Sequence, residues 1–316
     1  MDKPKVIVIC GPTASGKTGL SIELAKKING EIISADSMQI YKEMNIGTAK
    51  ATKEEMQGIK HYLIDIVSPT ERYSVADFKR DAEKSIEEIL KKNKVPILVG
   101  GTGLYIDSVV KGIEYNEINI DLKYREKLEK IAEKEGLDKL YQLAMQIDKN
   151  ATEKISINDK KRIFRVLEIY KSTRKTKTEL EIESRKKKPK YSFHIFGTEL
   201  DREKLYDKIN LRVDKMIEEG LIEEVEKITK KYKSFPTAMQ GLGYKEIKDY
   251  LEGHYTKEEV IEKIKMETRR YAKRQITWFK RNKNIIWLNM EEQNSIQNHV
   301  KTILEVVKWK QKIIKN

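Results

Sequence analysis

An eight-residue run near the amino terminus has the composition of a phosphate-binding loop. Residues 11–18 read Gly-Pro-Thr-Ala-Ser-Gly-Lys-Thr and fit the pattern G-x-x-x-x-G-K-[ST] at every position. The glycines allow successive backbone N–H groups to turn inward. Lys17 can neutralise a terminal phosphate, and the Thr18 hydroxyl is an oxygen ligand suited to Mg²⁺. The run predicts a diphosphate or triphosphate site, and it does not indicate which molecule carries the phosphates.

An aspartate follows the second apolar run of the chain. Residues 31–36 have the pattern of a short strand that ends at Asp36. Ligands of open parallel sheets gather at the carboxyl ends of the strands, beside a phosphate loop. Asp36 is therefore a candidate general base for a reaction at the phosphate-bearing group. An ordinary turn aspartate is the alternative, and the position favours the functional interpretation.

The elements that would position these residues alternate between strands and helices. Ser74 and Asp77 have the spacing of a capping box, which predicts the start of a helix. Strands separated by helices indicate a parallel sheet covered on both faces. The predicted strands are residues 5–10, 31–36, 61–67 and 95–99, and the predicted helices are residues 18–28 and 74–92.

The pattern changes after Gly112. Residues 121–185 have helical periodicity, dense charge and no convincing strand, and strand patterns return at residues 191–197 and 285–288. We predict an α/β fold like that of the P-loop NTPases, with a parallel sheet flanked by helices and an inserted helical domain. The predicted boundaries are residues 1–113 and 191–316 for the core with its C-terminal helices, and residues 114–190 for the insertion.

Composition and charge narrow the class of protein. The chain of 316 residues has a net charge of +14, of which residues 101–316 hold +12. This asymmetry fits a polyanionic partner and, equally, a solvated lysine-rich surface. Cys10 is the only cysteine, which excludes a disulfide framework. No apolar run approaches the roughly 20 residues of a membrane span, and the start lacks the pattern of a signal peptide, so we expect a soluble cytoplasmic protein.

Short motifs occur in a fixed order along most of the chain. They include Asp-Ser-Met-Gln-Ile-Tyr at 36–41, Ile-Gly-Thr-Ala-Lys at 46–50, Gly-Gly-Thr-Gly-Leu-Tyr at 100–105, Gly-Tyr-Lys-Glu at 243–246 and Thr-Arg-Arg-Tyr-Ala-Lys-Arg-Gln at 268–275. An Asn-Asp pair at 158–159 also leads into Arg162, Arg165 and Glu168. Together with the phosphate loop, the series resembles the tRNA dimethylallyltransferases, also called tRNA isopentenyltransferases.

The resemblance implies a reaction and its partners. A dimethylallyl group would pass from dimethylallyl diphosphate to N6 of the adenine immediately 3′ of the tRNA anticodon, position 37, giving N6-(dimethylallyl)adenosine and diphosphate. In this family the phosphate loop holds diphosphate and does not hydrolyse ATP. The implied partner is the anticodon stem-loop and the implied cofactor is Mg²⁺. We expect a monomer that does not associate with membranes.

Catalytic and diphosphate-binding roles follow from the resemblance, position by position. Asp36 is implied as the base that takes the N6 proton. Lys17, Thr18 with Mg²⁺ as its metal, and Arg212 are implied to stabilise the leaving group. On the sequence alone, Arg212 is better explained as an exposed charge on a helix at residues 208–219. The implied diphosphate-binding residues are Gly11, Pro12, Thr13, Ala14, Ser15, Gly16, Lys17 and Thr18.

Contacts with tRNA are predicted from the resemblance and from charge. Residues 154–191 have a net charge of +9 and residues 265–283 a net charge of +7, which suits a phosphate backbone. In the second stretch the aromatic side chains Tyr271, Trp278 and Phe279 are expected in the core of an amphipathic helix. The predicted tRNA-binding residues are Asp36, Ser37, Met38, Gln39, Thr102, Arg125, Lys161, Arg162, Ile163, Phe164, Arg165, Gln240, Gly241, Leu242, Gly243, Tyr244, Lys245, Arg269, Arg270 and Arg274.

Two other classes of function explain part of the sequence. A small-molecule kinase would use the same phosphate loop and Asp36. However, the strand at residues 95–99 ends in Gly-Gly-Thr-Gly and lacks the carboxylate of a Walker B element. A noncatalytic RNA-binding protein with a degenerate loop is disfavoured by the intact Gly16-Lys17-Thr18 sequence.

Overall fold

The computed structural model describes residues 3–113, 121–184, 189–291 and 295–308. The chain divides into two compact units, one formed by Met1–Val110 with Lys190–Asn316 and the other by Lys111–Pro189. The predicted start of the insertion at residue 114 lies outside the described residues.

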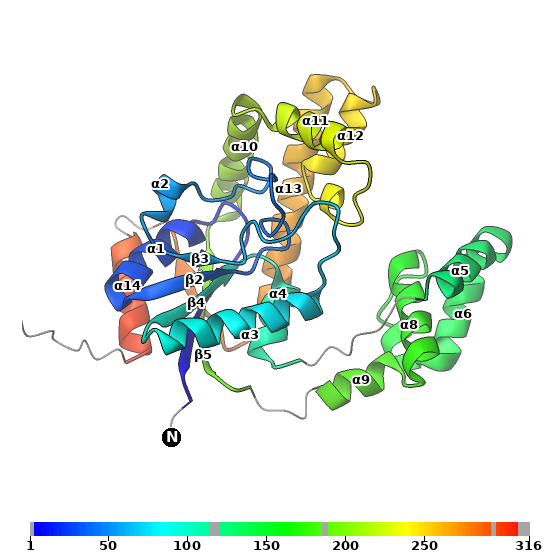
Figure 1. Ribbon diagram of the computed structural model, residues 1–316, viewed down its shortest axis with the longest axis horizontal. Coiled ribbons are helices and arrows are strands. Elements are labelled where there is room, and N and C mark those ends of the chain that lie inside the picture. Colours follow the sequence, from blue (N-terminus) through cyan, green and yellow to red (C-terminus); the bar gives the residue numbers. More distant parts are fainter. Residues whose placement is uncertain (1–2, 114–120, 185–188, 292–294, 309–316) are drawn as a thin grey trace, which may run out of the picture. The chain divides into compact units, whose positions relative to one another are not determined.

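The first unit is built on a parallel sheet of six strands within the described residues (Figure 1). The strand order is β3-β2-β4-β1-β5-β6, and every neighbouring pair is parallel, as predicted. This order places β1, which leads into the phosphate loop, between β4 and β5. The strands are β1 Lys5–Cys10, β2 Gly30–Ser34, β3 His61–Tyr62, β4 Val95–Gly100, β5 Ser192–Glu199 and β6 Ile286–Asn289.

Helices cover both faces of this sheet because successive strand residues point to opposite sides. Ile7 of β1 packs in a cluster with α1 and α14, and the next residue, Val8, packs in a cluster with α3 and α4. Ser74 and Asp77 form the predicted capping box at the start of α3. The helices are α1 Lys17–Ile28, α3 Val75–Lys91, α4 Gly103–Val110 and α14 Ser295–Val306.

The prediction of a third strand over residues 61–67 is wrong beyond its first two residues. β3 ends at Tyr62, because Leu63 and Asp65 have φ angles of 61° and 56°, in the left-handed region and outside the extended conformation of a regular strand. The chain regains one parallel bridge at Val67, opposite Tyr41.

Most of the remaining helices of the first unit pack against the loop that follows β2. Tyr41 and Met44 of this loop share a buried cluster with Val213 and Tyr244. No helix within the described residues combines the length and apolar character needed to cross a membrane. The helices are α2 Lys53–Met56, α10 Arg202–Glu218, α11 Leu221–Lys231, α12 Tyr244–Leu251 and α13 Lys257–Phe279, with a 3₁₀ turn at Ala238–Gln240.

The second unit is helical in its described part, as the periodicity of residues 121–185 predicts. Leu128, Leu140 and Phe164 form its core, where α5, α6 and α8 meet. The helices are α5 Leu122–Glu135, α6 Leu137–Ile147, α7 Lys149–Thr152, α8 Lys160–Thr173 and α9 Lys177–Ser184.

Candidate active site

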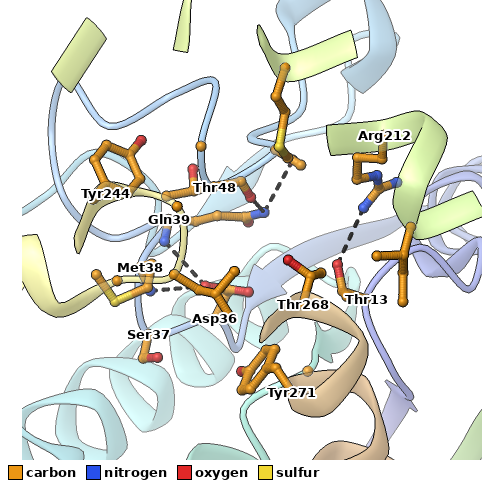
Figure 2. A pocket seen from close by; sticks show the side chains of 18 of the residues that line it. Thr13, Asp36, Ser37, Met38, Gln39, Thr48, Arg212, Tyr244, Thr268 and Tyr271 are labelled. Atoms are coloured by element: carbon orange, nitrogen blue, oxygen red, sulfur yellow. Dashed lines mark hydrogen bonds between the residues drawn. The ribbon is translucent and has the colours of Figure 1, made fainter. Parts of the chain in front are cut away.

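A cavity of about 460 Å³ opens at the carboxyl ends of β1, β2 and β4 (Figure 2). One wall contains the phosphate loop, the loop after β2 and the turn after β4, and the opposite wall contains α10, α13 and the segment before α12. Polar groups on both walls therefore face one shared volume. They include Thr13, Lys17, Thr18, Asp36, Ser37, Gln39, Arg212, Thr268, Tyr271 and Arg274.

Local contacts hold the phosphate loop in shape. Gly16 has a φ of 86° and Ala14 a φ of 61°, and α1 starts immediately afterwards at Lys17. The Ser15 hydroxyl donates to the Pro12 carbonyl at 2.7 Å and lies 2.6 Å from the hydroxyl of Thr198 on β5. The loop thus presents the amino-terminal end of α1 to the cavity, the place where an anion is most stable.

Two cationic side chains meet beside this loop. Nη1 of Arg212 donates to the Thr13 hydroxyl at 3.4 Å, and Nζ of Lys17 donates to the Pro12 carbonyl at 2.5 Å. Burial, followed by the charge of Arg212, lowers the pKa of Lys17 to about 8. Part of the Arg212 side chain reaches solvent, but partial burial by the surrounding protein lowers the pKa of Arg212 as well. Two mutually repelling cations at an anion-binding helix end form a receptor for a strongly charged anion.

Arg212 is exposed on α10, as the sequence alone indicated, but its side chain also lies in the cavity wall beside the phosphate loop, which the sequence alone did not indicate. The cause is tertiary: α10 packs against α13, and this contact carries the side chain over the phosphate loop.

Asp36 lies two residues beyond the end of β2, in the cavity wall (Figure 2). Its Oδ1 accepts hydrogen bonds from the backbone N–H groups of Met38 at 2.9 Å and Gln39 at 3.3 Å. The Ser37 N–H donates to the hydroxyl of Thr102 at 3.1 Å, which ties this turn to the one after β4. No hydrogen bond or ion pair within the described residues engages Oδ2, so that oxygen can accept a proton.

The long helix α13 supplies residues whose roles the sequence did not indicate. Gln275 accepts a hydrogen bond from the Thr13 N–H at 2.9 Å and donates to the Gly101 carbonyl at 3.0 Å. The prediction that Tyr271 is a core residue is wrong, because its ring lines the cavity. Burial and, to a smaller extent, Asp36 raise the pKa of Tyr271 to about 12, so the phenol stays neutral. Phe279 is buried in the core as expected.

A carboxylate outside the cavity wall fixes the loop that follows Asp36. Glu224 of α11 accepts hydrogen bonds from the backbone N–H groups of Asn45, Ile46 and Gly47 and from the Tyr244 hydroxyl. The sequence pointed to Gly47 and Tyr244 through the motifs, but nothing near Glu224 singled it out.

Half of the residues predicted to bind tRNA lie in the cavity wall. Thr102 adjoins it through Ser37, while Lys245 is exposed outside its wall. Arg269 donates to Asn210 at 2.6 Å, and Arg270 pairs with Glu267 at the surface. The predicted tRNA-binding residues in the cavity wall are Asp36, Ser37, Met38, Gln39, Gln240, Gly241, Leu242, Gly243, Tyr244 and Arg274.

The other predicted tRNA-binding residues belong to the helical unit. Arg125 lies on α5, and Lys161, Arg162 and Arg165 lie on α8. The side chains of Ile163 and Phe164 are buried in that unit's core, so they shape the helix and present no surface to RNA. Contact with tRNA at Arg125, Lys161, Arg162 and Arg165 stays a prediction.

The phosphate loop has a ligand that suits magnesium. The Thr18 hydroxyl is exposed and makes no hydrogen bond within the part of the chain that the structure describes. It lines the same cavity as the carboxylate of Asp36. Oxygen donors beside a phosphate site are the set that Mg²⁺ prefers, so these residues fit the ion.

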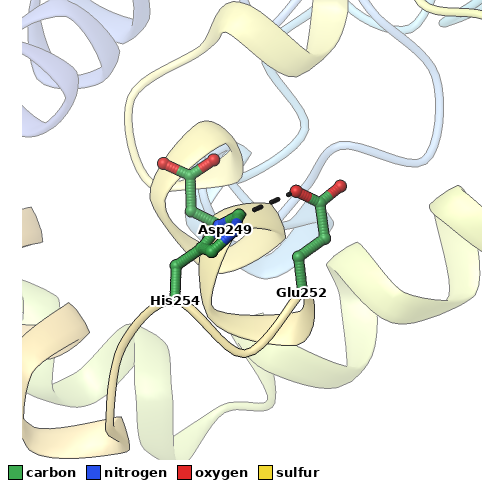
Figure 3. A group of neighbouring side chains, drawn as sticks. All are labelled: Asp249, Glu252 and His254. Atoms are coloured by element: carbon green, nitrogen blue, oxygen red, sulfur yellow. Dashed lines mark ion pairs between the residues drawn. The ribbon is translucent and has the colours of Figure 1, made fainter.

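A second group of possible metal ligands lies outside the cavity wall. Asp249, Glu252 and His254 approach one another at the end of α12 (Figure 3). Glu252 and His254 are exposed and 3.9 Å apart, and Asp249 also pairs with Lys263 at 3.8 Å. Ordinary surface ion pairs explain this group.

Comparison with known proteins identifies the family. The model of a family described as IPP transferase matches residues 39–282. The chain belongs to this family. It is 52% identical over 299 residues to the tRNA dimethylallyltransferase of Acetivibrio thermocellus, a match that covers 94% of this chain and 96% of the relative.

Solved structures of the IPP transferase family have the same fold. The full-length tRNA isopentenylpyrophosphate transferase of Bacillus halodurans is 42% identical, with a TM-score of 0.73 and 97% of each chain covered. A eukaryotic dimethylallyltransferase acting on tRNA is 30% identical, with a TM-score of 0.81. That match covers 96% of this chain and 80% of the eukaryotic one. The α/β fold predicted from the sequence is thereby confirmed.

Proposed function

We propose that this enzyme transfers the dimethylallyl group of dimethylallyl diphosphate to N6 of the adenine immediately 3′ of the anticodon in tRNA. One observation supports this most directly: Lys17 and Arg212 at a phosphate loop share one cavity with the carboxylate of Asp36. A transferase that expels diphosphate and removes a proton needs these groups together.

The donor diphosphate would bind at the phosphate loop. Its negative charge would be stabilised by Lys17, by Arg212 and by the amino-terminal end of α1, and this stabilisation increases as the bond to the allylic carbon breaks. Mg²⁺ held by the Thr18 hydroxyl would supply further neutralisation of the leaving diphosphate. Apolar side chains of the same cavity suit a five-carbon group, among them Val99, Ile209, Val213 and Met216.

Asp36 would serve the acceptor. As the adenine N6 lone pair forms a bond to the allylic carbon, the carbon–oxygen bond breaks and both of its electrons leave with diphosphate. The nitrogen then carries a positive charge and loses a proton to Oδ2 of Asp36. The hydrogen bonds from Met38 and Gln39 to Oδ1 keep the carboxylate oriented for this transfer.

The acceptor base must leave its stack in the anticodon loop to enter such a cavity. Extrusion costs a few kcal/mol and is least costly in loops. The basic residues of α8, and separately the exposed Arg274 at the cavity, suit contact with the phosphate backbone of the tRNA.

The test supplies labelled donors to purified protein. Protein, Mg²⁺ and unmodified tRNA are incubated with dimethylallyl diphosphate labelled in the allylic group, and in parallel with labelled ATP and small hydroxyl acceptors. The expected result is label in tRNA from the allylic donor alone. Phosphate transfer from ATP to a small acceptor, without allylic transfer, would replace the proposal with a kinase.

A further inference from the structure

Arg165 differs from Lys160 and Arg162 of the same helix in having no ion pair within the described residues. It is half-buried, yet its side chain makes no hydrogen bond or ion pair within the described residues. Arg162 on the same helix pairs with Asp159 at 3.3 Å, and Lys160 pairs with Glu129. Burial lowers the pKa of Arg165, which shows that the protein surroundings disfavour its charge. The half-buried guanidinium group of Arg165 therefore lacks acceptors for its N–H donors within the described residues.

A buried carboxylate interacts electrostatically with both Arg165 and a second arginine. Glu168 of α8 is only 3% exposed, and its Oε1 accepts no hydrogen bond within the described residues. Nε of Arg125, on α5, lies 3.2 Å from that oxygen. Burial raises the pKa of Glu168, and the charges of Arg125 and Arg165 oppose the increase. The three side chains form an electrostatic group that joins α5 to α8.

Two arginines and one glutamate give the group a net charge of one positive unit. The two guanidinium groups also have N–H donors that are not used within the described residues. Apart from the contact of its Nε with Glu168, the side chain of Arg125 makes no hydrogen bond or ion pair in the described chain. Arg125 and Arg165 repel each other, since the charge of Arg125 helps to lower the pKa of Arg165. The negative charge of Glu168 offsets this repulsion. An oxyanion that receives the forked donors of both guanidinium groups would complete the group.

We propose that Glu168 is a positioning residue that holds the guanidinium groups of Arg125 and Arg165 together as a receptor for one phosphate of the tRNA backbone. This inference rests on the proposed function. It assigns no role to Glu168 in the chemical step, which takes place in the other unit of the chain.

The effect of Glu168→Gln on the affinity for tRNA distinguishes a residue that only contributes charge from one that positions the arginines. The substitution keeps the shape of the side chain and removes one negative charge from a basic unit. If Glu168 only adds charge, its loss leaves the affinity for tRNA unchanged or increases it. If Glu168 positions the arginines, we expect the Kd for tRNA to rise about tenfold, roughly the loss of one charge-assisted contact.

Matched variants separate this effect from changes of charge or folding. Glu129→Gln removes a surface charge from α5 of the same unit and should leave the Kd unchanged or slightly lower. Arg165→Lys keeps the charge but loses the fork, and we expect a several-fold rise in Kd. In the Glu168→Gln background, Arg165→Lys should add little, because the receptor is already disrupted. Circular dichroism and thermal unfolding check that each variant is folded.

The measurements are tRNA affinity over a range of salt concentrations and transfer of the dimethylallyl group at saturating tRNA. Arg165→Gln should reduce the slope of log K against log salt by up to about 0.9, the value for one phosphate contact in a duplex. Glu168→Gln should raise the KM for tRNA and leave kcat near wild type. Wild-type or tighter binding by folded Glu168→Gln, or additive effects in the double variant, would overturn the inference. Failure of the wild-type enzyme to transfer the group would instead contradict the proposed function.

Discussion

The side-chain carbonyl of Gln275 accepts a hydrogen bond from the backbone N–H of Thr13 at 2.9 Å. The amide group of the same side chain donates to the Gly101 carbonyl at 3.0 Å. Gly101 has no room for a larger side chain, because a Cβ there would lie 2.2 Å from Nε2 of Gln275. One residue of α13 therefore sets the separation between the phosphate loop and the turn after β4.

Loss of this bridge should affect both stability and donor binding. Gln275→Leu leaves the Thr13 N–H and the Gly101 carbonyl without partners in the protein, which should lower the free energy of unfolding by about 2–4 kcal/mol. The KM for the allylic donor should rise about tenfold, because small displacements of a binding loop are costly. Urea denaturation and steady-state kinetics measure the two effects. Gln142→Leu, at an exposed position of α6, is the control and should change neither.

Removal of the proposed base should reduce turnover and leave binding intact. Asp36→Asn keeps the size of the side chain and can still accept from Met38, but it cannot take a proton. We expect kcat to fall by about 10²–10⁴, with the Kd for tRNA within a few-fold of wild type. Single-turnover transfer and filter binding provide the two measurements. Turnover like that of the wild type would remove Asp36 from the role of base.

The lowered pKa of Lys17 predicts how diphosphate affinity varies with pH. With a pKa of about 8 in the free enzyme, Lys17 is charged below this pH and neutral above it. Affinity for inorganic diphosphate should therefore decrease as the pH rises from 7 to 9.5. Because Arg212 contributes to the lowered pKa, Arg212→Gln should move this decrease to higher pH while weakening binding overall. Calorimetric titrations measure the midpoint, and Lys17→Met should lack this transition.

The Thr18 hydroxyl should be necessary for the effect of magnesium. Thr18→Val removes the hydroxyl oxygen and keeps the shape of the side chain, so the stimulation of transfer by Mg²⁺ should fall at least tenfold. Thr18→Ser should keep most of the stimulation. The experiment titrates Mg²⁺ into enzyme treated with a chelator and measures transfer. Equal stimulation of the valine variant and the wild type would exclude Thr18 as a ligand.

Much of the site could be predicted from the sequence because it depends on neighbouring residues. The phosphate loop is one continuous run between a buried strand and a helix, and Asp36 follows the next strand within a few residues. Parallel strands align their carboxyl ends, so both features had to lie at one edge of the sheet. The helical unit was similarly evident from periodicity, because its core residues recur at helical spacing.

Two predictions from the sequence were wrong because they depend on the tertiary structure. The strand predicted at residues 61–67 has suitable apolar residues, but Leu63 and Asp65 adopt left-handed backbone conformations that the pattern does not reveal. The helical pattern around Tyr271 shows which face is apolar, and it does not show whether that face meets a core or a cavity.

The sequence by itself determined the phosphate loop, the parallel sheet and the place of Asp36, because each follows from residues within one strand and turn. Only the tertiary structure decided that Arg212, which is 199 residues from Thr13, reaches its hydroxyl, and that Gln275, 262 residues away, accepts its N–H. These contacts depend on how α10 and α13 pack. Helix packing is set by many weak side-chain contacts distributed over the chain, and no local motif encodes their sum.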